Sequence, residues 1–250
     1  MLKYMSDAAV LGCVAAHEAL QDAGVPGRFA PERIGLYAAT GLAAANVQDV
    51  STMIDASIDP QGKFSCRLLG ERGLPATNPL LSFKILANMP PCLISIIEGI
   101  KGPNFIFTPW EGQTAAAILE GWLAVRAGEV DCALVGAADA AAYPSTFVYL
   151  RQSGVLQTQE FPGSGAGYVV METRESARQA GRPVYAGLTH VRLQPSAGHP
   201  VVDPLAARIG RTFAAAPAIL LGLACLCERP RFSVCGVDRQ SLCVELGEAE

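Results

Sequence analysis

The residues with the clearest chemical potential lie where a short apolar segment meets a long helical one. Residues 104–108 have the composition of a short strand, residues 109–112 form a sharp turn, and residues 113–127 predict an Ala-rich helix that ends at Gly128. Glu111 therefore lies at the start of this helix, where the positive end of the helix dipole favours a carboxylate. A stabilising acid in the first helical turn is a sufficient explanation of Glu111 at this level.

The histidines and cysteines do not form a catalytic or metal-binding pattern. His17 is expected within a helix and His190 on a strand, and neither is spaced to activate a nucleophile. The eight cysteines include no C-x-x-C pair, and those near the C-terminus lie inside apolar runs, as buried thiols do. We therefore expect no metal and no cofactor.

A glycine-rich segment at residues 163–167 precedes a predicted strand at residues 168–172. Loops that hold phosphate follow a strand and open a helix, which is the opposite order. These glycines are therefore expected to allow a tight turn or close backbone packing.

The elements that must position these residues alternate between strands and helices. Apolar runs predict strands at 34–41, 104–108, 130–137, 168–172 and 183–193, with a terminal strand pair at 231–246. Helical signals lie at 7–23, 78–87, 113–127, 173–181 and 203–227, and the prolines at 90 and 91 predict a break. This alternation predicts an α/β protein with a mostly parallel or mixed sheet.

Residues 102–139 carry an ordered set of motifs, and the spacing from Gly102 to Asp131 needs no gap. The set reads Gly102-Pro103, a strand, the turn Trp110-Glu111-Gly112, a long helix, Gly128-Glu129-Val130-Asp131, and a strand that ends in Gly136-Ala137-Ala138-Asp139. This order resembles β-ketoacyl synthases of the thiolase fold. Further matches extend the resemblance over about residues 6–175, and they include Leu20-Gln21-Asp22-Ala23-Gly24, Asn88-Met89 and Gly165-Ala166-Gly167-Tyr168.

The resemblance implies a thiolase-like layered α-β-α fold, truncated at the N-terminus and compressed in the C-terminal half. Residues 1–182 would form the N-terminal-like half of a ketosynthase, and residues 183–250 a shortened C-terminal half packed on it. The family's first strand, expected at the centre of the sheet, would precede Leu2. Without this strand, the strands beside it would have unpaired backbone N–H and C=O groups, which would lower the stability of the sheet. We therefore expect another segment or a partner chain to fill its place.

The catalytic Cys and His residues of the family are missing from the matching positions. In the family a Cys at the strand-to-helix turn carries the acyl chain as a thioester, and here that position is Glu111. One catalytic His position matches Arg211 in the segment Gly210 to Pro217. Asp203-Pro204 resembles the end of the second His loop, which is absent, and His199 is out of place by spacing.

These departures resemble the chain-length factors of type II polyketide systems, which lack the Cys and pair with an active ketosynthase. The resemblance implies a non-condensing subunit, a pseudoenzyme that shapes the acyl tunnel in a hetero-oligomer with an active ketosynthase and an acyl carrier protein. Glu111 would fill the nucleophile position, with Gln113 as a second candidate. The tunnel or interface would include Met89, Phe105, Phe107, Trp110 and Gly112, and the strand at 104–108 would pair with a partner strand.

Two other functions stay open. The chain could be a thioester-processing enzyme, a decarboxylase or hydrolase, in which Glu111 serves as acid or base. It could also be a purely structural scaffold.

Composition excludes several classes of protein. Half of the 250 residues are hydrophobic and 17% are charged, which excludes intrinsic disorder. The 19 basic and 23 acidic residues give a net charge of −4 without a basic cluster, so nucleic acid is not an expected partner. The most apolar run, residues 213–227, is too short to span a membrane, and the N-terminus lacks the apolar region of a signal peptide. A cytoplasmic protein is therefore expected, with apolar surfaces that a partner covers.

Overall fold

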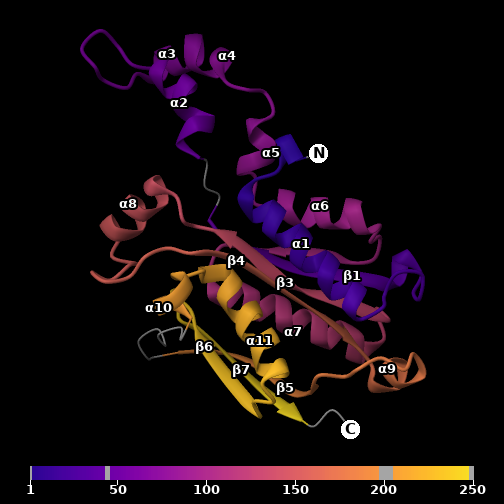
Figure 1. Ribbon diagram of the computed structural model, residues 1–250. Helices are drawn as coiled ribbons and strands as arrows, with labels where there is room; N and C mark the ends of the chain where they lie inside the picture. The colour runs from indigo at the N-terminus through magenta and orange to yellow at the C-terminus, as the bar shows by residue number, and fades with distance from the viewer. Residues whose placement is uncertain (1, 43–45, 197–204, 248–250) are drawn as a thin grey trace.

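The computed structural model describes residues 2–42, 46–196 and 205–247 (Figure 1). His199 and Asp203-Pro204, which the resemblance singled out, lie outside the described residues.

The main sheet contains four strands in the order β2-β1-β3-β4. They are β1 (Ile34–Thr40), β2 (Asn104–Phe107), β3 (Cys132–Ala140) and β4 (Ser164–Glu172). The first three are parallel, and β4 runs antiparallel to β3, so the predicted mixed sheet is confirmed. The expectation that another segment or a partner chain fills the place of the family's first strand is wrong, because β1 pairs along its whole length with β3 and no interior place is left between the described strands.

Helices cover both faces of this sheet. One face packs against α1 (Asp7–Asp22) and α6 (Met89–Glu98), and the other packs against α7 (Glu111–Ala127) and α11 (Ala216–Leu226). Because both faces are covered, β1 and β3 are buried at every position and their sequences do not alternate.

A second, antiparallel sheet has the order β5-β7-β6 and packs on the far side of α7. Its strands are β5 (Gly187–Pro195), β6 (Arg231–Cys235) and β7 (Gln240–Gly247). Ile118 of α7 shares one core cluster with Tyr37 of the main sheet and Leu242 of the second, so α7 lies between the two sheets. This core cluster includes residues from before and after residue 182, so the two predicted parts of the chain share one core. The division of the chain at residue 182 stays a prediction.

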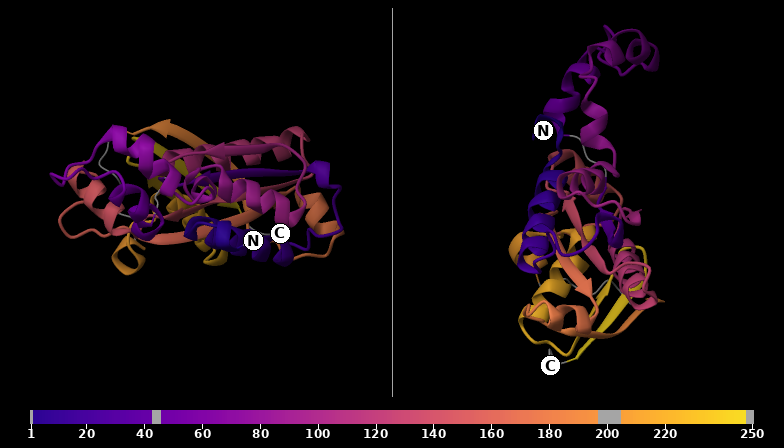
Figure 2. Two further views of the ribbon diagram at one scale, coloured as in Figure 1. Left: turned by 90° about the horizontal axis from the view of Figure 1, so that it is seen from above. Right: turned by 90° about the vertical axis from the view of Figure 1, so that its right-hand side faces the viewer.

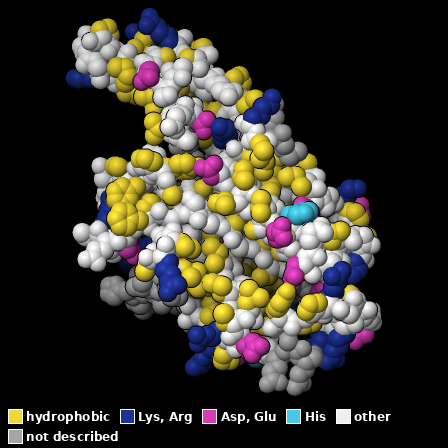
Figure 3. Space-filling model, viewed as in Figure 1, with side chains coloured by type: hydrophobic (Ala, Val, Ile, Leu, Met, Phe, Trp, Pro, Cys, Tyr) yellow, Lys and Arg dark blue, Asp and Glu magenta, His cyan; other side chains and the backbone are white. Residues whose placement is uncertain are grey.

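An arm, residues 47–76, projects away from the layered body (Figures 1 and 2). It contains α2 (Val47–Asp55), α3 (Cys66–Leu68), the π-helical turn η3 (Leu69–Gly73) and α4 (Leu74–Ala76). No residue of α2 is buried. In the view of Figure 3, basic side chains lie at the far end of the arm.

The remaining elements differ from the sequence predictions in three places. The predicted break at the prolines is confirmed, but Met89 and the two prolines after it also start α6, which was not predicted, because the first turn of a helix does not need its backbone N–H groups. Helix α8 (Pro144–Gln152) was not predicted, and α5 (Leu81–Ile85) is shorter than expected. The other short elements are η1 (Leu2–Tyr4), η2 (Pro31–Arg33), α9 (Arg174–Gln179), α10 (Ala206–Ile209) and η4 (Phe213–Ala215).

The glycine-rich segment 163–167 packs closely, as predicted. A Cβ on Gly167 would lie 2.7 Å from the backbone nitrogen of Ile219, and a Cβ on Gly136 would lie 2.2 Å from the carbonyl oxygen of Gly167. These glycines let α11 and β3 approach β4. Within the described residues, no helix is both long enough and apolar enough to cross a membrane.

Candidate functional site

Glu111 is the first residue of α7 and is almost completely buried, with 5% of its surface exposed. Strand β2 ends at Phe107, and the following turn brings the chain to the start of α7. The helix begins two residues earlier than the sequence predicted, and the predicted place of Glu111 at its positive end is confirmed.

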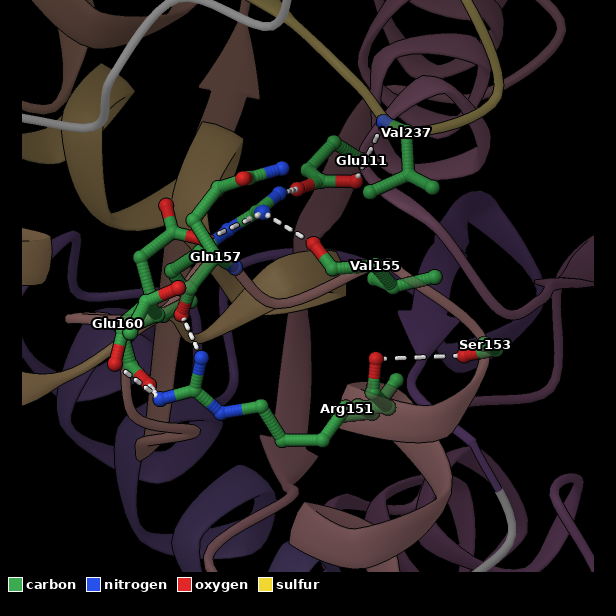
Figure 4. A network of polar contacts seen from close by, with 10 residues as sticks. Glu111, Arg151, Ser153, Val155, Gln157, Glu160 and Val237 are labelled. Atoms are coloured by element: carbon green, nitrogen blue, oxygen red, sulfur yellow. Dashed lines mark hydrogen bonds and ion pairs between the residues drawn. The ribbon is translucent and has the colours of Figure 1, made fainter.

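Both carboxylate oxygens of Glu111 accept hydrogen bonds from other segments of the chain. Arg211 Nη2 donates to Oε1 at 3.1 Å, and the backbone N–H of Val237 donates to Oε2 at 3.1 Å (Figure 4). Arg211 precedes α11, and Val237 lies in the turn between β6 and β7. The carboxylate therefore joins three segments that are far apart in the sequence.

Arg211 is the centre of this network. Its side chain is 11% exposed, and Nη1 donates to the carbonyl oxygen of Val155 at 3.1 Å and lies 3.5 Å from Glu160 Oε2. The guanidinium also lies 4.8 Å from the centre of the Phe213 ring. Arg151 donates to three carbonyl groups of residues 157–160 and so orders the loop that contacts Arg211 (Figure 4).

A second carboxyl group, Asp139, lies at the end of β3 and is 1% exposed. Burial raises the pKa of Asp139 well above the usual range, and the nearby negative charge of Glu111 raises it further. The backbone N–H groups of Ala214 and Ala140 partly oppose this rise. Asp139 Oδ2 accepts from Ala214 N at 3.3 Å, whereas Oδ1 has no partner among the described residues. Asp139 is thus held next to the turn that presents Arg211.

That turn is conformationally strained. Phe213 has a φ of +37°, which a bulky residue adopts only under tertiary constraint. Two contacts hold Ala214: the bond to Asp139 and the hydrogen bond that Thr114 of α7 donates to its carbonyl oxygen. In this conformation Phe213 contacts Trp110 and Arg211 contacts Glu111, both at the start of α7.

Some of the predicted site residues lie beside Glu111. Gly112 is buried, and a Cβ there would lie 2.4 Å from Asp238 Oδ2, so a larger residue would force the Asp238 carboxylate to shift. The Trp110 ring meets the Phe213 ring edge-on at 5.9 Å. Gln113 follows in the same helical turn, where its N–H bonds to the carbonyl oxygen of Trp110.

The other predicted residues lie away from the Glu111 carboxylate. Phe107 packs against buried alanines of β1 and β3. Phe105 is 52% exposed and stacks on Tyr37, with ring centres 5.5 Å apart. Met89 packs with the core on the opposite face of the main sheet, so the structure does not bring it into this network.

Sequence reasoning missed Asp139 as a site residue, and also Glu160 and Val237. The signal for Asp139 was an acid inside an otherwise apolar strand. Glu160 and Val237 gave no signal, because one contributes from a loop and the other through its backbone.

The histidines that the structure describes lie outside the network. His190 contacts Glu245 across the second sheet at 3.2 Å, and His17 contacts Glu98 at 3.0 Å. Among the described residues, no group of three or more His, Cys, Asp or Glu side chains is arranged to hold a metal ion.

Comparison with known proteins agrees with the resemblance found in the sequence. The family model for the β-ketoacyl synthase N-terminal domain matches residues 1–177. The chain belongs to the β-ketoacyl synthase family. No curated protein matches it closely enough to be counted as a relative.

Solved ketosynthase structures share the thiolase-like fold of this β-ketoacyl synthase family member at low identity. The ishigamide ketosynthase/chain length factor is 17% identical with a TM-score of 0.76, over all of this chain and 84% of the other. A structure of a type II polyketide synthase acyl-carrier protein in complex with its ketosynthase gives 18% identity and a TM-score of 0.63, over 77% of this chain and 54% of the other. A β-ketoacyl synthase from Burkholderia phymatum gives 18% identity and a TM-score of 0.60, over 89% and 54%. The chain thus spans about half the length of two of these three.

Proposed function

We propose that this chain is a non-condensing, chain-length-factor-like subunit of a polyketide or fatty-acid type biosynthetic complex in the cytoplasm. It partners an active ketosynthase in a hetero-oligomer, receives no acyl chain itself, and shapes the tunnel for the acyl chain delivered by an acyl carrier protein. The observation that carries this proposal is the buried ion pair between Glu111 and Arg211. The resemblance assigns these two positions to the nucleophile and to one catalytic His.

The chemistry of the ion pair supports a non-condensing role. A condensing enzyme needs a thiolate to hold the acyl group and an imidazole to exchange protons. A carboxylate forms no stable thioester, and a guanidinium does not lose its proton in proteins. The pair therefore fills both positions with groups that cannot carry out either step.

The alternative in which Glu111 acts as acid or base has less support. Such a group must reach the proton that it transfers. Both oxygens of Glu111 already accept protein hydrogen bonds, and the side chain is 6% exposed.

The exposed edge of the main sheet supports the proposal that a partner chain binds there. Strand β2 pairs only with β1 among the described strands, and Phe105 and Ile106 on it are 52% and 37% exposed. Helix α6 touches this strand through the hydrogen bond from Asn104 to Ser95 and exposes Ile96. An edge strand with apolar side chains on both faces is a template for pairing with another chain. We assign Met89, Phe105, Phe107, Trp110, Gly112 and Gln113 to this interface or to the tunnel behind it.

One experiment separates the three functions. The chain is co-expressed with an active ketosynthase of the same pathway, and condensation and product length are measured for the wild type, Glu111→Ala and Glu111→Gln. We expect the complex to condense, and product length to change with the variants only in the complex. Turnover of a thioester by the isolated chain, lost in both variants, would establish the enzyme alternative. Unchanged products and rates in every variant would establish the scaffold.

A second experiment tests the interface. Ile106→Asp places a charge on the exposed edge strand, so we expect it to abolish co-purification with the ketosynthase. Val148→Asp changes another exposed β-branched residue, on α8, which is 51% exposed against 37% for Ile106, and serves as the control. Equal co-purification of Ile106→Asp and the control would exclude β2 as the contact.

A further inference from the structure

The groups around the Glu111 carboxylate form a donor set of the kind that binds a small anion. Arg211 Nη2 contacts one oxygen and the Val237 N–H contacts the other, both at 3.1 Å. The carboxylate also lies at the N-terminal end of the 17-residue helix α7. These donors come from three segments and are held by their own packing.

The occupant of this donor set is part of the chain. Beyond its Cβ, the Glu111 side chain consists of one methylene group and a carboxylate, which are the atoms of acetate. The pocket that Glu111→Ala would leave therefore matches acetate in length, charge and hydrogen-bond acceptors.

We propose that the donor set of Arg211 and the Val237 N–H is a monocarboxylate-binding site that the native chain fills with its own Glu111 side chain, and that it binds free acetate once this side chain is cut back. In the native chain the site is closed to free carboxylates. The inference goes beyond the proposed function and does not depend on it.

The nearby acids shape the site without filling it. Glu160 contacts the other terminal nitrogen of Arg211 at 3.5 Å, which leaves Nη2 for the occupant. Asp139 is buried and hydrogen-bonds to Ala214. Asp238 lies over Gly112, where its Oδ1 accepts from Gln240 N at 3.4 Å. Arg211 Nη2 is accordingly the donor that a bound anion would meet.

The test measures the thermal unfolding of Glu111→Ala in sodium acetate and in sodium chloride at equal ionic strength. At about 0.1 M acetate, we expect the Tm of the variant to rise by about 3 °C over chloride, because a ligand that binds only the folded state stabilises it. The wild type, whose site is filled, should show no difference between the two salts. Propionate, one carbon longer, should be less effective than acetate.

Two controls link the effect to this site. Glu111→Ala with Arg211→Met lacks the cation and should lose the acetate response. Asp131→Ala cuts back the acid of the exposed Arg33–Asp131 ion pair, which is 41% and 47% exposed, and should show no acetate response.

The outcome is decisive even if Glu111→Ala folds poorly. In that case the yield of refolding from urea is compared in acetate and chloride, and a higher yield in acetate is the expected result. An acetate effect equal to that of chloride, or one of the same size in the wild type or in the Arg211→Met double variant, would overturn the proposal.

Discussion

Replacing Arg211 with methionine tests whether the buried ion pair holds the site together. Methionine keeps much of the apolar volume of the side chain but removes its charge and its donors. Glu111 would then be a charged group with 6% exposure and only the Val237 N–H as partner. Removing one member of a buried ion pair costs about 3–5 kcal/mol, because the remaining charge is left without compensation.

The expected size follows from the burial of both partners. The variant also loses the hydrogen bond from Arg211 to the Val155 carbonyl oxygen, and the range of about 3–5 kcal/mol includes that loss. We therefore expect the free energy of unfolding to fall by about 4 kcal/mol. For a chain of this length that is a decrease in Tm of about 10 °C. Urea unfolding of the wild type and the variant measures it.

An exposed ion pair provides the comparison. Arg33 and Asp131 lie 2.7 Å apart, closer than Arg211 and Glu111, but they are 41% and 47% exposed. Arg33→Met should therefore lower the free energy of unfolding far less than Arg211→Met, because solvent screens the exposed pair. Adding Glu111→Gln to Arg211→Met should recover about half of the loss, since a neutral amide still accepts from Val237. A loss for Arg211→Met no larger than that for Arg33→Met would refute the argument.

Three further predictions rest on packing and burial. Gly112→Ala should lower the free energy of unfolding by about 1–3 kcal/mol, because its Cβ would meet the carboxylate of Asp238, whereas the helical Gly70→Ala has open space and should not destabilise the chain. Asp139→Asn should stabilise the chain more at pH 7 than at pH 4. The raised pKa of Asp139 means that the folded state holds its proton above the unfolded pKa, so the wild type loses stability as pH rises through that window, and urea unfolding at both pH values measures the difference. In the native protein, an alkylating reagent should modify the two exposed thiols before the two whose pKa burial raises to about 11 and about 12, as peptide mass spectrometry can show. The exposed pair is Cys66 and Cys227, and the buried pair is Cys13 and Cys132.

Local sequence signals predicted the ends of those helices that are set by a capping residue or by a glycine at the helix end. Ser6 caps α1 through Ala9 N, and Gly128 ends α7 in the left-handed conformation, as their types and places indicate. Position within an element gave a weaker signal. The prolines at 90 and 91 correctly predicted a break after the preceding helix, but they did not indicate the helix that they begin, because a proline fits the first turn of a helix.

The site could be predicted only in part, because its contacts join distant segments. The place of Glu111 followed from the strand, turn and helix around it. Its partner Arg211 is 100 residues away, and only the order of motifs shared with the family related the two positions. The contact through the Val237 backbone has no sequence signal, since any non-proline residue supplies an N–H.

The burial of Glu111 and Arg211 explains why the two residues must occur together. Without Arg211, Glu111 would be a buried charge without a counter-charge, at a cost of several kcal/mol, and without Glu111, Arg211 would keep only the longer contact with Glu160 at 3.5 Å. An acid at position 111 therefore requires a base at position 211, and a chain with a thiol at 111 has no need of one. Related chains that carry Glu or Asp at 111 should accordingly carry Arg or Lys at 211, whereas those with Cys should not. A set of relatives in which the two positions vary independently would show that the ion pair is incidental, and the assignment of this site to a non-condensing subunit would lose its main support.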